Sequence, residues 1–349
     1  MKARRPKSKG GQGRKPRKAT AKVSQKALRR AHAFVAAFPG REGKGEGDPQ
    51  DAGVQESMRL NRWLSEQGVA SRRKADELIQ EGHVEINGEE VTALGTQVRP
   101  GDQVRVKGKL IKPVPHLYYL FHKPKGVLCT ENPRESRTKV WDLVAPMVPT
   151  RVYPVGRLDE ESEGLLLLTN DGDFANLVAH PRFGVPKTYV VQLQGELTPE
   201  ETEQVRRGVY LAEGRVVPSR VRVLRRSKKS SLVEIVLREG LNREVRRIFA
   251  KVGHGVRHLK RVRIGGVGLQ GLPRGGLRPL TSLERKSLVA LAEQGRETAD
   301  LTKPKRNRTR AKRTGKSGFR PGSPRRTSKA RRKKSGRSPF VRGSKDSRR

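Results

Sequence analysis

The sequence has few of the features that secreted and membrane proteins depend on. Cys129 is the only cysteine among 349 residues, so no disulfide can form within the chain, and a reducing compartment such as the cytoplasm is expected. No run of apolar residues approaches the roughly 20 that a membrane-spanning helix needs. The N-terminus is basic and has no apolar core, which argues against a secretory signal peptide. We therefore expect neither secretion nor a membrane partner.

Acidic residues are also scarce, and the excess of positive charge is concentrated at the two ends. The chain has 78 Lys and Arg against 35 Asp and Glu, a formal net charge of +43. Residues 1–57 carry 15 basic and 5 acidic side chains, and residues 303–349 carry 21 and 1. Such segments attract polyanions, because each phosphate that Lys or Arg neutralises releases counterions. Nucleic acid is favoured over an anionic membrane, since neither end shows a clear amphipathic helix with large apolar anchors.

Composition divides the chain into five segments. Residues 1–57 and 296–349 are rich in Lys, Arg, Ser, Gly and Pro and lack hydrophobic periodicity, so both are predicted to be disordered basic tails. Residues 58–107 form a small module, residues 108–116 a linker with Pro and Lys, and residues 117–295 a longer module. Strands and helices do not alternate regularly in the longer module. This predicts an α+β domain with a mixed, mainly antiparallel sheet.

The small module combines two short helices with a compact hairpin. Apolar residues recur at helical spacing around Leu60 and Leu78, and Ser71 is a natural N-cap for the second helix. Strands are expected at 83–87 and 103–106, where polar turns follow or precede short apolar runs. The helix pair carries five basic residues within sixteen positions, which suits either a solvated face or contact with phosphates. These candidates for RNA contact are Arg59, Arg62, Arg72, Arg73 and Lys74.

Two patterns that resemble cofactor or metal sites are rejected. Gly266, Gly268 and Gly271 match a dinucleotide fingerprint, but the Leu-Pro that follows cannot open the helix whose N-terminus would bind phosphate. His254 and His258 have the spacing of metal ligands on a helix, but glycines flank the first of them and no third ligand stands nearby. We therefore predict neither a metal nor an organic cofactor.

Three segments of the longer module stand out as candidates for a functional site. The first, PVGRLDEESEGLLLLTNDG at 154–172, places Asp159 on a glycine-flanked loop beside a buried strand. Functional groups are often carried on such loops, although a carboxylate that caps a turn would give the same pattern. The second, VPKTY at 185–189, contains Tyr189 where an ordinary strand core residue would also fit. The third, REGLNREVRRIF at 238–249, has the pattern of an amphipathic helix.

The helix predicted from the third segment has Asn242 as its N-cap and Ile248 within its apolar stripe. At roughly 100° per residue, Arg246 lies nearest the edge of that stripe. It can therefore reach from the helix edge into a cleft, to pair with a carboxylate or to hold a phosphate. Arg243 and Arg247 point further outward, towards solvent or RNA. Without the neighbouring segments, Arg246 would be interpreted as an ordinary surface charge.

Together with Lys123-Pro-Lys125-Gly, these segments closely resemble the Rsu/Rlu-type family of ribosomal RNA pseudouridine synthases. The small module resembles the S4 RNA-binding domain that such enzymes carry at the N-terminus, and the resemblance covers about 58–292. It implies that the chain isomerises uridine to pseudouridine in ribosomal RNA, without a cofactor and with the target base flipped out of its stack. Glu244, where many relatives have Gln, is a minor difference.

The resemblance also assigns roles to individual residues. Asp159 is the expected catalytic aspartate, acting as nucleophile or as initiating base, and Arg246 is the basic residue beside it. Tyr189 is expected to stack on the base and to help remove the C5 proton. The residues expected around the substrate base are Arg157, Leu158 and Leu237. Those expected to contact RNA, beside the five of the small module, are Lys123, Lys125, Arg243 and Arg247.

Two other functions are compatible with the sequence. A non-catalytic S4-type ribosome assembly factor would use the same small module and tails, and loss of Asp159 would be silent in it. A basic nuclear or organellar protein would need only the tails. For the enzyme, the long basic C-terminal tail favours large-subunit over small-subunit ribosomal RNA as substrate. Ribosomal RNA and ribosomal assembly intermediates are the expected partners, and a monomer is expected.

Overall fold

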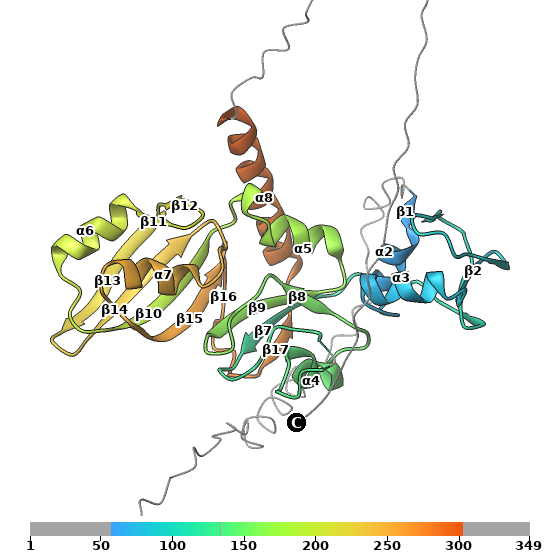
Figure 1. Cartoon of the computed structure of the whole chain (residues 1–349), viewed down its shortest axis with the longest axis horizontal. Coiled ribbons are helices and arrows are strands. Elements are labelled where there is room, and N and C mark those ends of the chain that lie inside the picture. The colour runs from blue at the N-terminus through green and yellow to red at the C-terminus, as the bar shows by residue number, and fades with distance from the viewer. Residues whose placement is uncertain (1–56, 133, 303–349) are drawn as a thin grey trace, which may run out of the picture. The chain divides into compact units, whose positions relative to one another are not determined.

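The computed structural model describes residues 57–132 and 134–302 (Figure 1). Most of both predicted tails therefore lies outside the described residues. The exception is the last helix, α8 (Ser282–Thr302), which continues through 296–302 and contradicts the prediction that the C-terminal tail begins at residue 296. Ala, Leu, Glu, Gln and Arg in its second half favour helix propagation even without an apolar stripe. The lack of periodicity in this stretch was therefore a poor guide to its structure.

The N-terminal domain packs two helices against short strands. In chain order its elements are β1 (Met58–Arg59), α2 (Leu60–Glu66), α3 (Arg72–Gln80), β2 (Val84–Ile86), β3 (Glu89–Glu90), β4 (Gln97–Val98), β5 (Val104–Val106) and β6 (Lys109–Leu110). Four strands form a sheet in the order β3-β2-β5-β6, and β1 pairs with β4. Ser71 caps α3, as predicted, because its side chain accepts a hydrogen bond from the backbone N–H of Lys74.

Strand β6 lies in the segment predicted to be a linker, so the start of that linker at residue 108 is wrong. Lys109 and Leu110 pair antiparallel with β5 across a tight turn. Lys107 and Gly108 at the turn have φ angles of 51° and 74°, the left-handed conformation that two-residue hairpin turns use. Lysine is not a usual residue at such a position, and the hairpin was therefore missed.

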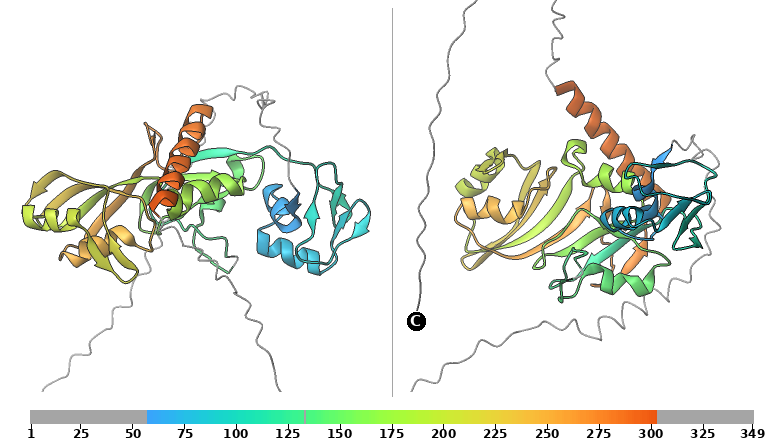
Figure 2. Two further views of the ribbon diagram at one scale, coloured as in Figure 1. Left: turned by 90° about the horizontal axis from the view of Figure 1, so that it is seen from above. Right: turned by 45° about the vertical axis from the view of Figure 1, so that its right-hand side comes forward.

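The larger domain is built on a nine-stranded sheet with helices packed against it (Figures 1 and 2). In chain order its elements are β7 (Tyr118–Lys123), α4 (Val140–Val144), the 3₁₀ turn η2 (Ala145–Met147), β8 (Tyr153–Val155), β9 (Glu163–Thr169), α5 (Gly172–Ala179), the 3₁₀ turn η3 (Pro181–Phe183), β10 (Lys187–Gln194), α6 (Pro199–Arg207), β11 (Val209–Leu211), β12 (Gly214–Val216), β13 (Arg220–Ser227), β14 (Ser230–Leu237), α7 (Glu244–Lys251), β15 (Val256–Ile264), β16 (Val267–Gly268), β17 (Leu277–Pro279) and α8.

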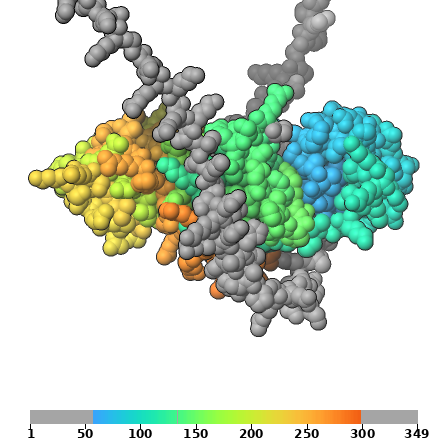
Figure 3. Space-filling view, turned by 90° about the horizontal axis from the view of Figure 1, so that it is seen from below, coloured from blue at the N-terminus to red at the C-terminus, as the bar shows by residue number. Residues whose placement is uncertain are grey.

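The order of the sheet is β13-β14-β10-β15-β9-β7-β17, with β8 paired to β9 and β16 paired to β15. All of these pairs are antiparallel except β9 with β15, which run parallel. The predicted α+β fold with a mixed, mainly antiparallel sheet is therefore confirmed. The hairpin that joins β13 to β14 projects from the end of the sheet (yellow in Figure 3) and exposes Lys228 and Lys229.

Strand β9 is buried on both faces, which explains its unbroken run of leucines. Leu165 and Leu167 pack with Phe174 of α5 and Leu288 of α8 on one face. The two leucines that alternate with them pack on the other face against α4. Because every position of the run faces apolar neighbours, the sequence lacks the alternation of a half-exposed strand. This strand holds the end of the loop that carries Asp159.

The parallel contact between β9 and β15 depends on a glycine. Gly164 has a φ angle of 117°, and a Cβ at this position would overlap the backbone oxygen of Arg261 and lie 2.7 Å from its nitrogen. We expect Gly164→Ala to lower the free energy of unfolding by roughly 2–4 kcal/mol, from backbone strain and the clash together. Gly214→Ala is the control, because Gly214 has a φ angle of 135° but no atom within 4 Å of the place that a Cβ would take. Equal losses in urea denaturation would contradict a role for close strand approach.

Candidate active site

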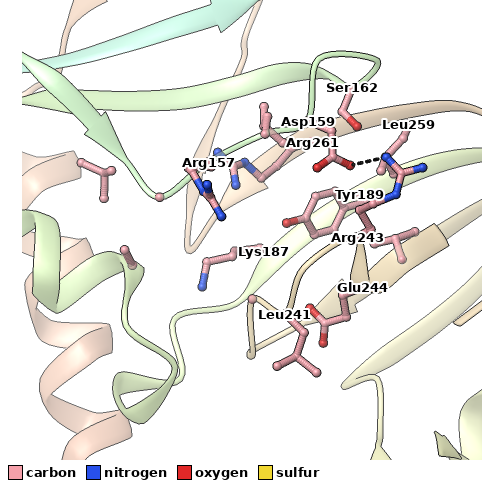
Figure 4. A pocket seen from close by; sticks show the side chains of 16 residues that line it. Arg157, Asp159, Ser162, Lys187, Tyr189, Leu241, Arg243, Glu244, Leu259 and Arg261 are labelled. Carbon is pink, nitrogen blue, oxygen red and sulfur yellow. Dashed lines mark ion pairs between the residues drawn. The ribbon is translucent and has the colours of Figure 1, made fainter. Parts of the chain in front are cut away.

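A pocket opens between the loop that joins β8 to β9, strand β10, strand β15 and the beginning of α7 (Figure 4). The loop contributes Asp159, β10 contributes Lys187 and Tyr189, β15 contributes Arg261, and α7 contributes Glu244. The three sequence segments that were singled out therefore meet at one site. Their side chains converge because the sheet places β10 next to β15, and β15 next to β9.

Two guanidinium groups approach the carboxylate of Asp159. The Oδ2 atom of Asp159 lies 3.7 Å from Nη1 of Arg243 and 3.8 Å from Nε of Arg246. The Asp159 side chain is 29% exposed, so it lies at the pocket wall within reach of a ligand. Arg246 is 12% exposed and also donates a hydrogen bond to the backbone oxygen of Val256. The structure thus brings Arg246 from the helix edge to a carboxylate, as its position on the helix suggested.

Arg243 begins α7 in an unusual backbone conformation. It occupies the N-cap with φ and ψ angles of 47° and 33°, and no side chain caps the helix. The prediction that Asn242 is the N-cap is therefore wrong, because the chain enters the helix through a left-handed residue one position later. Non-glycine residues rarely adopt this conformation except where the surroundings impose it. Here the conformation delivers the Arg243 side chain to Asp159.

Lys123 is fully buried and holds the loop that carries Asp159. Its Nζ donates hydrogen bonds to the backbone oxygens of Pro124, Asp159 and Ser162, at 3.1, 3.1 and 2.8 Å. Burial lowers the pKa of Lys123 to about 8. The prediction that Lys123 contacts RNA is therefore wrong, since its amine cannot reach a phosphate. Lys125 is exposed and stays a candidate for that role.

Two further buried cations line the pocket. Lys187 is 7% exposed and donates from Nζ to the backbone oxygens of Val185 and Glu239. Burial, and then the charge of Arg261, lower the pKa of Lys187 to about 8. Arg261 is 3% exposed, and its Nε donates to the backbone oxygen of Leu165 at 2.7 Å. Sequence reasoning missed Arg261, because its strand also contains Arg257, Lys260 and Arg263 and nothing distinguishes the one that faces inward.

The residues expected around the base divide into two groups. Arg157 and Leu158 line the pocket, the first exposed and the second buried. Leu237 is 2% exposed in the core beneath β14 and is not among the lining residues, so its predicted place in the pocket is wrong. The side chains of β14 alternate between the core and the opposite face of the strand. Leu237, the last residue of the strand, is one of those that face the core. Leu241 and Leu259 are among the apolar lining residues instead.

The remaining candidates for RNA contact differ in how free their charges are. Arg62 forms an ion pair with Glu66 at 2.8 Å, and Arg247 forms a two-pronged pair with Glu213 at 2.8 and 3.0 Å. Phosphate would have to compete with these carboxylates. The exposed candidates of the N-terminal domain are Arg59, Arg72, Arg73 and Lys74. Their contact with RNA remains a prediction. Lys74 already forms an ion pair with Glu77 on the same helix.

Residues 57–132 and 134–302 contain neither a cluster of metal-ligand side chains nor a membrane-spanning helix. In this part of the chain, no three His, Cys, Asp or Glu side chains are grouped so that they could hold a metal ion. Within the same residues, no helix has both the length and the apolar character required to span a bilayer.

Comparison with known proteins identifies the family. Residues 117–251 match the family model of RNA pseudouridylate synthases, and residues 58–104 match that of the S4 domain. The chain is 42% identical over 240 residues to ribosomal large subunit pseudouridine synthase B of Bacillus subtilis, a match that covers 68% of this chain and 98% of the relative. It is 36% identical over 252 residues to the dual-specificity RNA pseudouridine synthase RluF of Escherichia coli K12, covering 71% and 83%.

A solved structure is also similar. The crystal structure of a pseudouridylate synthase, 27% identical, aligns with 67% of this chain and 100% of its own chain at a TM-score of 0.49. The sequence matches make the family clear: the chain belongs to the RNA pseudouridine synthases and carries an N-terminal S4 domain. It is therefore an isomerase, and the expected resemblance to Rsu/Rlu-type enzymes is confirmed. A purely structural or assembly role is no longer needed to explain the S4 module.

The contacts of Lys123 predict a positioning role that can be separated from RNA binding. We expect Lys123→Met to lower the single-turnover rate by roughly 100-fold, because the Asp159 loop loses its anchor and small displacements of reacting groups are costly. RNA affinity should stay within about 2-fold, since the side chain is buried. Lys125→Met, two residues away and exposed, should show the reverse pattern, with weaker RNA binding and an unchanged rate. If both variants lowered only RNA affinity, Lys123 would not position the loop.

The burial of Glu244 predicts that the stability of the folded protein depends on pH. Burial, and then the nearby charge of Glu239, raise the pKa of Glu244 to about 7, above its ordinary value of 4.5. Between these values the folded chain holds a proton that the unfolded chain has lost, so stability falls as the pH rises from about 4.5 to 7. Glu244→Gln removes this loss and should gain on the order of 2 kcal/mol relative to wild type between pH 5 and pH 8. Urea titrations at pH 5 and at pH 8 measure this gain, and an equal stability of wild type at the two pH values would contradict it.

Proposed function

We propose that this enzyme isomerises uridine to pseudouridine in ribosomal RNA, with Asp159 as the catalytic carboxylate. The observation that carries the proposal is the Asp159 carboxylate on a pocket wall, with Arg243 and Arg246 within 4 Å and Tyr189 on the same pocket. In this proposal the carboxylate acts as a nucleophile or as a base, and the two guanidinium groups hold it at the pocket wall. The S4 domain and the exposed basic residues around it would hold the RNA.

The proposed reaction balances without any other reactant. The bond between N1 of uracil and C1′ of the ribose breaks, the base turns, and a bond forms between C5 and C1′. The proton that leaves C5 replaces the bond lost at N1, so substrate and product are isomers and no electrons are gained or lost. For this reason we propose a mechanism that uses only side chains of the chain. Tyr189 is half-buried and lines the pocket, where its ring can stack on the flipped base.

The preferred substrate is large-subunit ribosomal RNA in this proposal. Support comes from the similarity to ribosomal large subunit pseudouridine synthase B of Bacillus subtilis and from the 21 basic side chains of residues 303–349. A basic tail of this kind adds affinity for phosphates without selecting a base. Action on ribosomal assembly intermediates, a monomeric state and a cytoplasmic location remain predictions. Mapping pseudouridines in both ribosomal RNAs, in cells with and without the protein, would identify the subunit and the position.

Removing the charge of Asp159 tests the proposal directly. Asp159→Asn keeps the shape of the side chain but is neither a nucleophile nor a base, so we expect pseudouridine formation to fall by at least about 10³-fold. RNA affinity should change by less than about 3-fold, because a carboxylate is not itself a ligand for phosphate. Glu160→Gln, the same change on the next residue, should keep full activity, since Glu160 pairs with Arg137 instead. Pseudouridine formed in an rRNA transcript is the measurement, and an active Asp159→Asn variant would overturn the proposed role.

A further inference from the structure

Basic residues gather on the strand at one edge of the large sheet. Among the described residues, β13 pairs with β14 on one side only, so its other edge is free (Figure 1). Residues 215–229, which contain this strand, have seven basic side chains and no acidic one. All seven are exposed: Arg215, Arg220, Arg222, Arg225, Arg226, Lys228 and Lys229. The active site described above uses none of them, although they belong to the same domain.

A groove lies between α6 and the free edge of β13, and its charged lining is entirely basic. Four arginines line it, and we call it the arginine groove after them: Arg206 of α6 and Arg222, Arg225 and Arg226 of β13. The other four lining residues, from these two elements, are uncharged. A concave surface whose charges all have one sign concentrates ions of the opposite sign. The arginine groove is therefore suited to an anionic ligand.

Two of the four arginines are held in place by the backbone. Arg206 donates from Nε and Nη2 to the backbone oxygen of Val221, at 3.3 and 3.2 Å. Arg226 donates from Nε to the backbone oxygen of Leu197 at 2.8 Å. A guanidinium has five N–H donors, so both side chains keep donors for a ligand. Glu203 lies 3.6 Å from Nη1 of Arg206 and competes for that one nitrogen.

The other two arginines have no partner among the described residues. Neither Arg222 nor Arg225 forms a hydrogen bond or an ion pair with this part of the chain. In the pairing with β14 they lie opposite Glu234 and Leu232, whose side chains point away from the core that α6 covers. Arg226, by contrast, lies opposite the buried Ser231. The free edge of β13 thus has cations on both of its sides.

The groove lies close to the active site in the plane of the sheet. Val221 of β13 is opposite Ile235 of β14, which is itself opposite Tyr189 of β10. Two strand spacings therefore separate Val221 from Tyr189, roughly 10 Å. This distance equals the rise of about three nucleotides along a helical strand. An RNA whose target base enters the pocket has neighbouring nucleotides within reach of the groove.

We propose that the arginine groove binds the phosphate backbone of the ribosomal RNA that flanks the flipped uridine. Guanidinium groups match phosphates well, because their planar N–H donors can engage two phosphate oxygens at once. Contacts to phosphates fix the position of an RNA without reading its sequence. The groove therefore adds affinity and orients the RNA, and it does not select the base. The inference rests on the proposed function for the identity of the ligand, and it adds a binding surface outside the S4 domain and the tails.

The salt dependence of RNA binding tests the groove. Arg222→Gln with Arg225→Gln removes the two charges that hold nothing else in the fold. With full-length protein and a transcript that spans the mapped uridine, we expect this double variant to bind about 10-fold more weakly at low salt. The slope of log Kd against log salt should fall by about 1.5, because each lost phosphate contact contributes roughly 0.7–0.9. Arg222→Lys with Arg225→Lys should keep most of the slope, since lysine also neutralises phosphate.

Shortening the RNA tests where the contact lies. Trimming the nucleotides that flank the target should weaken binding by wild type, and this loss should be about 10-fold smaller in the double glutamine variant. Arg263→Gln with Lys286→Gln is the matched control, because it removes the same charge from exposed residues of β15 and α8. It should keep the wild-type slope and the full effect of trimming. An equal loss in the control would reduce the effect to net charge and refute a specific groove.

The alternative is that these cations protect the edge of the sheet. Charged side chains on an edge strand prevent it from pairing with another chain. If the double glutamine variant bound RNA like wild type but formed oligomers in size-exclusion chromatography, the groove would not be an RNA site. The binding measurements need no turnover. Failure of wild type to form pseudouridine would therefore count against the proposed function alone, whereas an unchanged salt slope in the double glutamine variant would count against the groove.

Discussion

The buried amine of Lys123 fixes the loop that carries Asp159, the proposed catalytic carboxylate, and the rest of the site is arranged around that loop. Burying a cation is costly unless its donors are satisfied, and backbone oxygens from the loop around Asp159 satisfy them here. The same hydrogen bonds make the loop rigid, although it has no regular secondary structure. A carboxylate on a loop thereby gains the precision of one on a strand.

The sheet supplies the second constraint, because it brings together residues that are far apart in the chain. The parallel pairing of β9 with β15 is made close by Gly164 and sets Arg261 beside the loop that precedes β9. On its other side, β15 pairs with β10 and places Arg261 opposite Tyr189. Loop, tyrosine and buried guanidinium are therefore positioned by backbone pairing, whereas Arg243, Arg246 and Glu244 depend on the setting of α7.

How well the sequence predicted these features depended on whether the signal was local. The helix cap at Ser71, the buried leucine strand and the orientation of Arg246 follow from neighbouring residues, and the structure agrees with them. The burial of Lys123 and Arg261 could not be predicted, because it depends on strands paired across the sheet, and each of them looks like any other basic residue. The left-handed entry into α7 could not be predicted either, because arginine rarely adopts this backbone conformation and nothing in the sequence marks this one.

The exposed and the buried basic residues around the pocket suit different parts of a nucleotide, the phosphate and the base. Exposed cations such as Lys125, Arg157 and Arg243 can meet phosphates, which remain hydrated and charged as RNA binds. Arg261 and Lys187 are buried, where only an uncharged group such as a base can follow them without a large desolvation cost. A surplus of basic residues would by itself hold any RNA. Selection of a single base needs groups in fixed positions, and the hydrogen bonds that Lys187 and Arg261 make to backbone oxygens fix two such groups at this pocket.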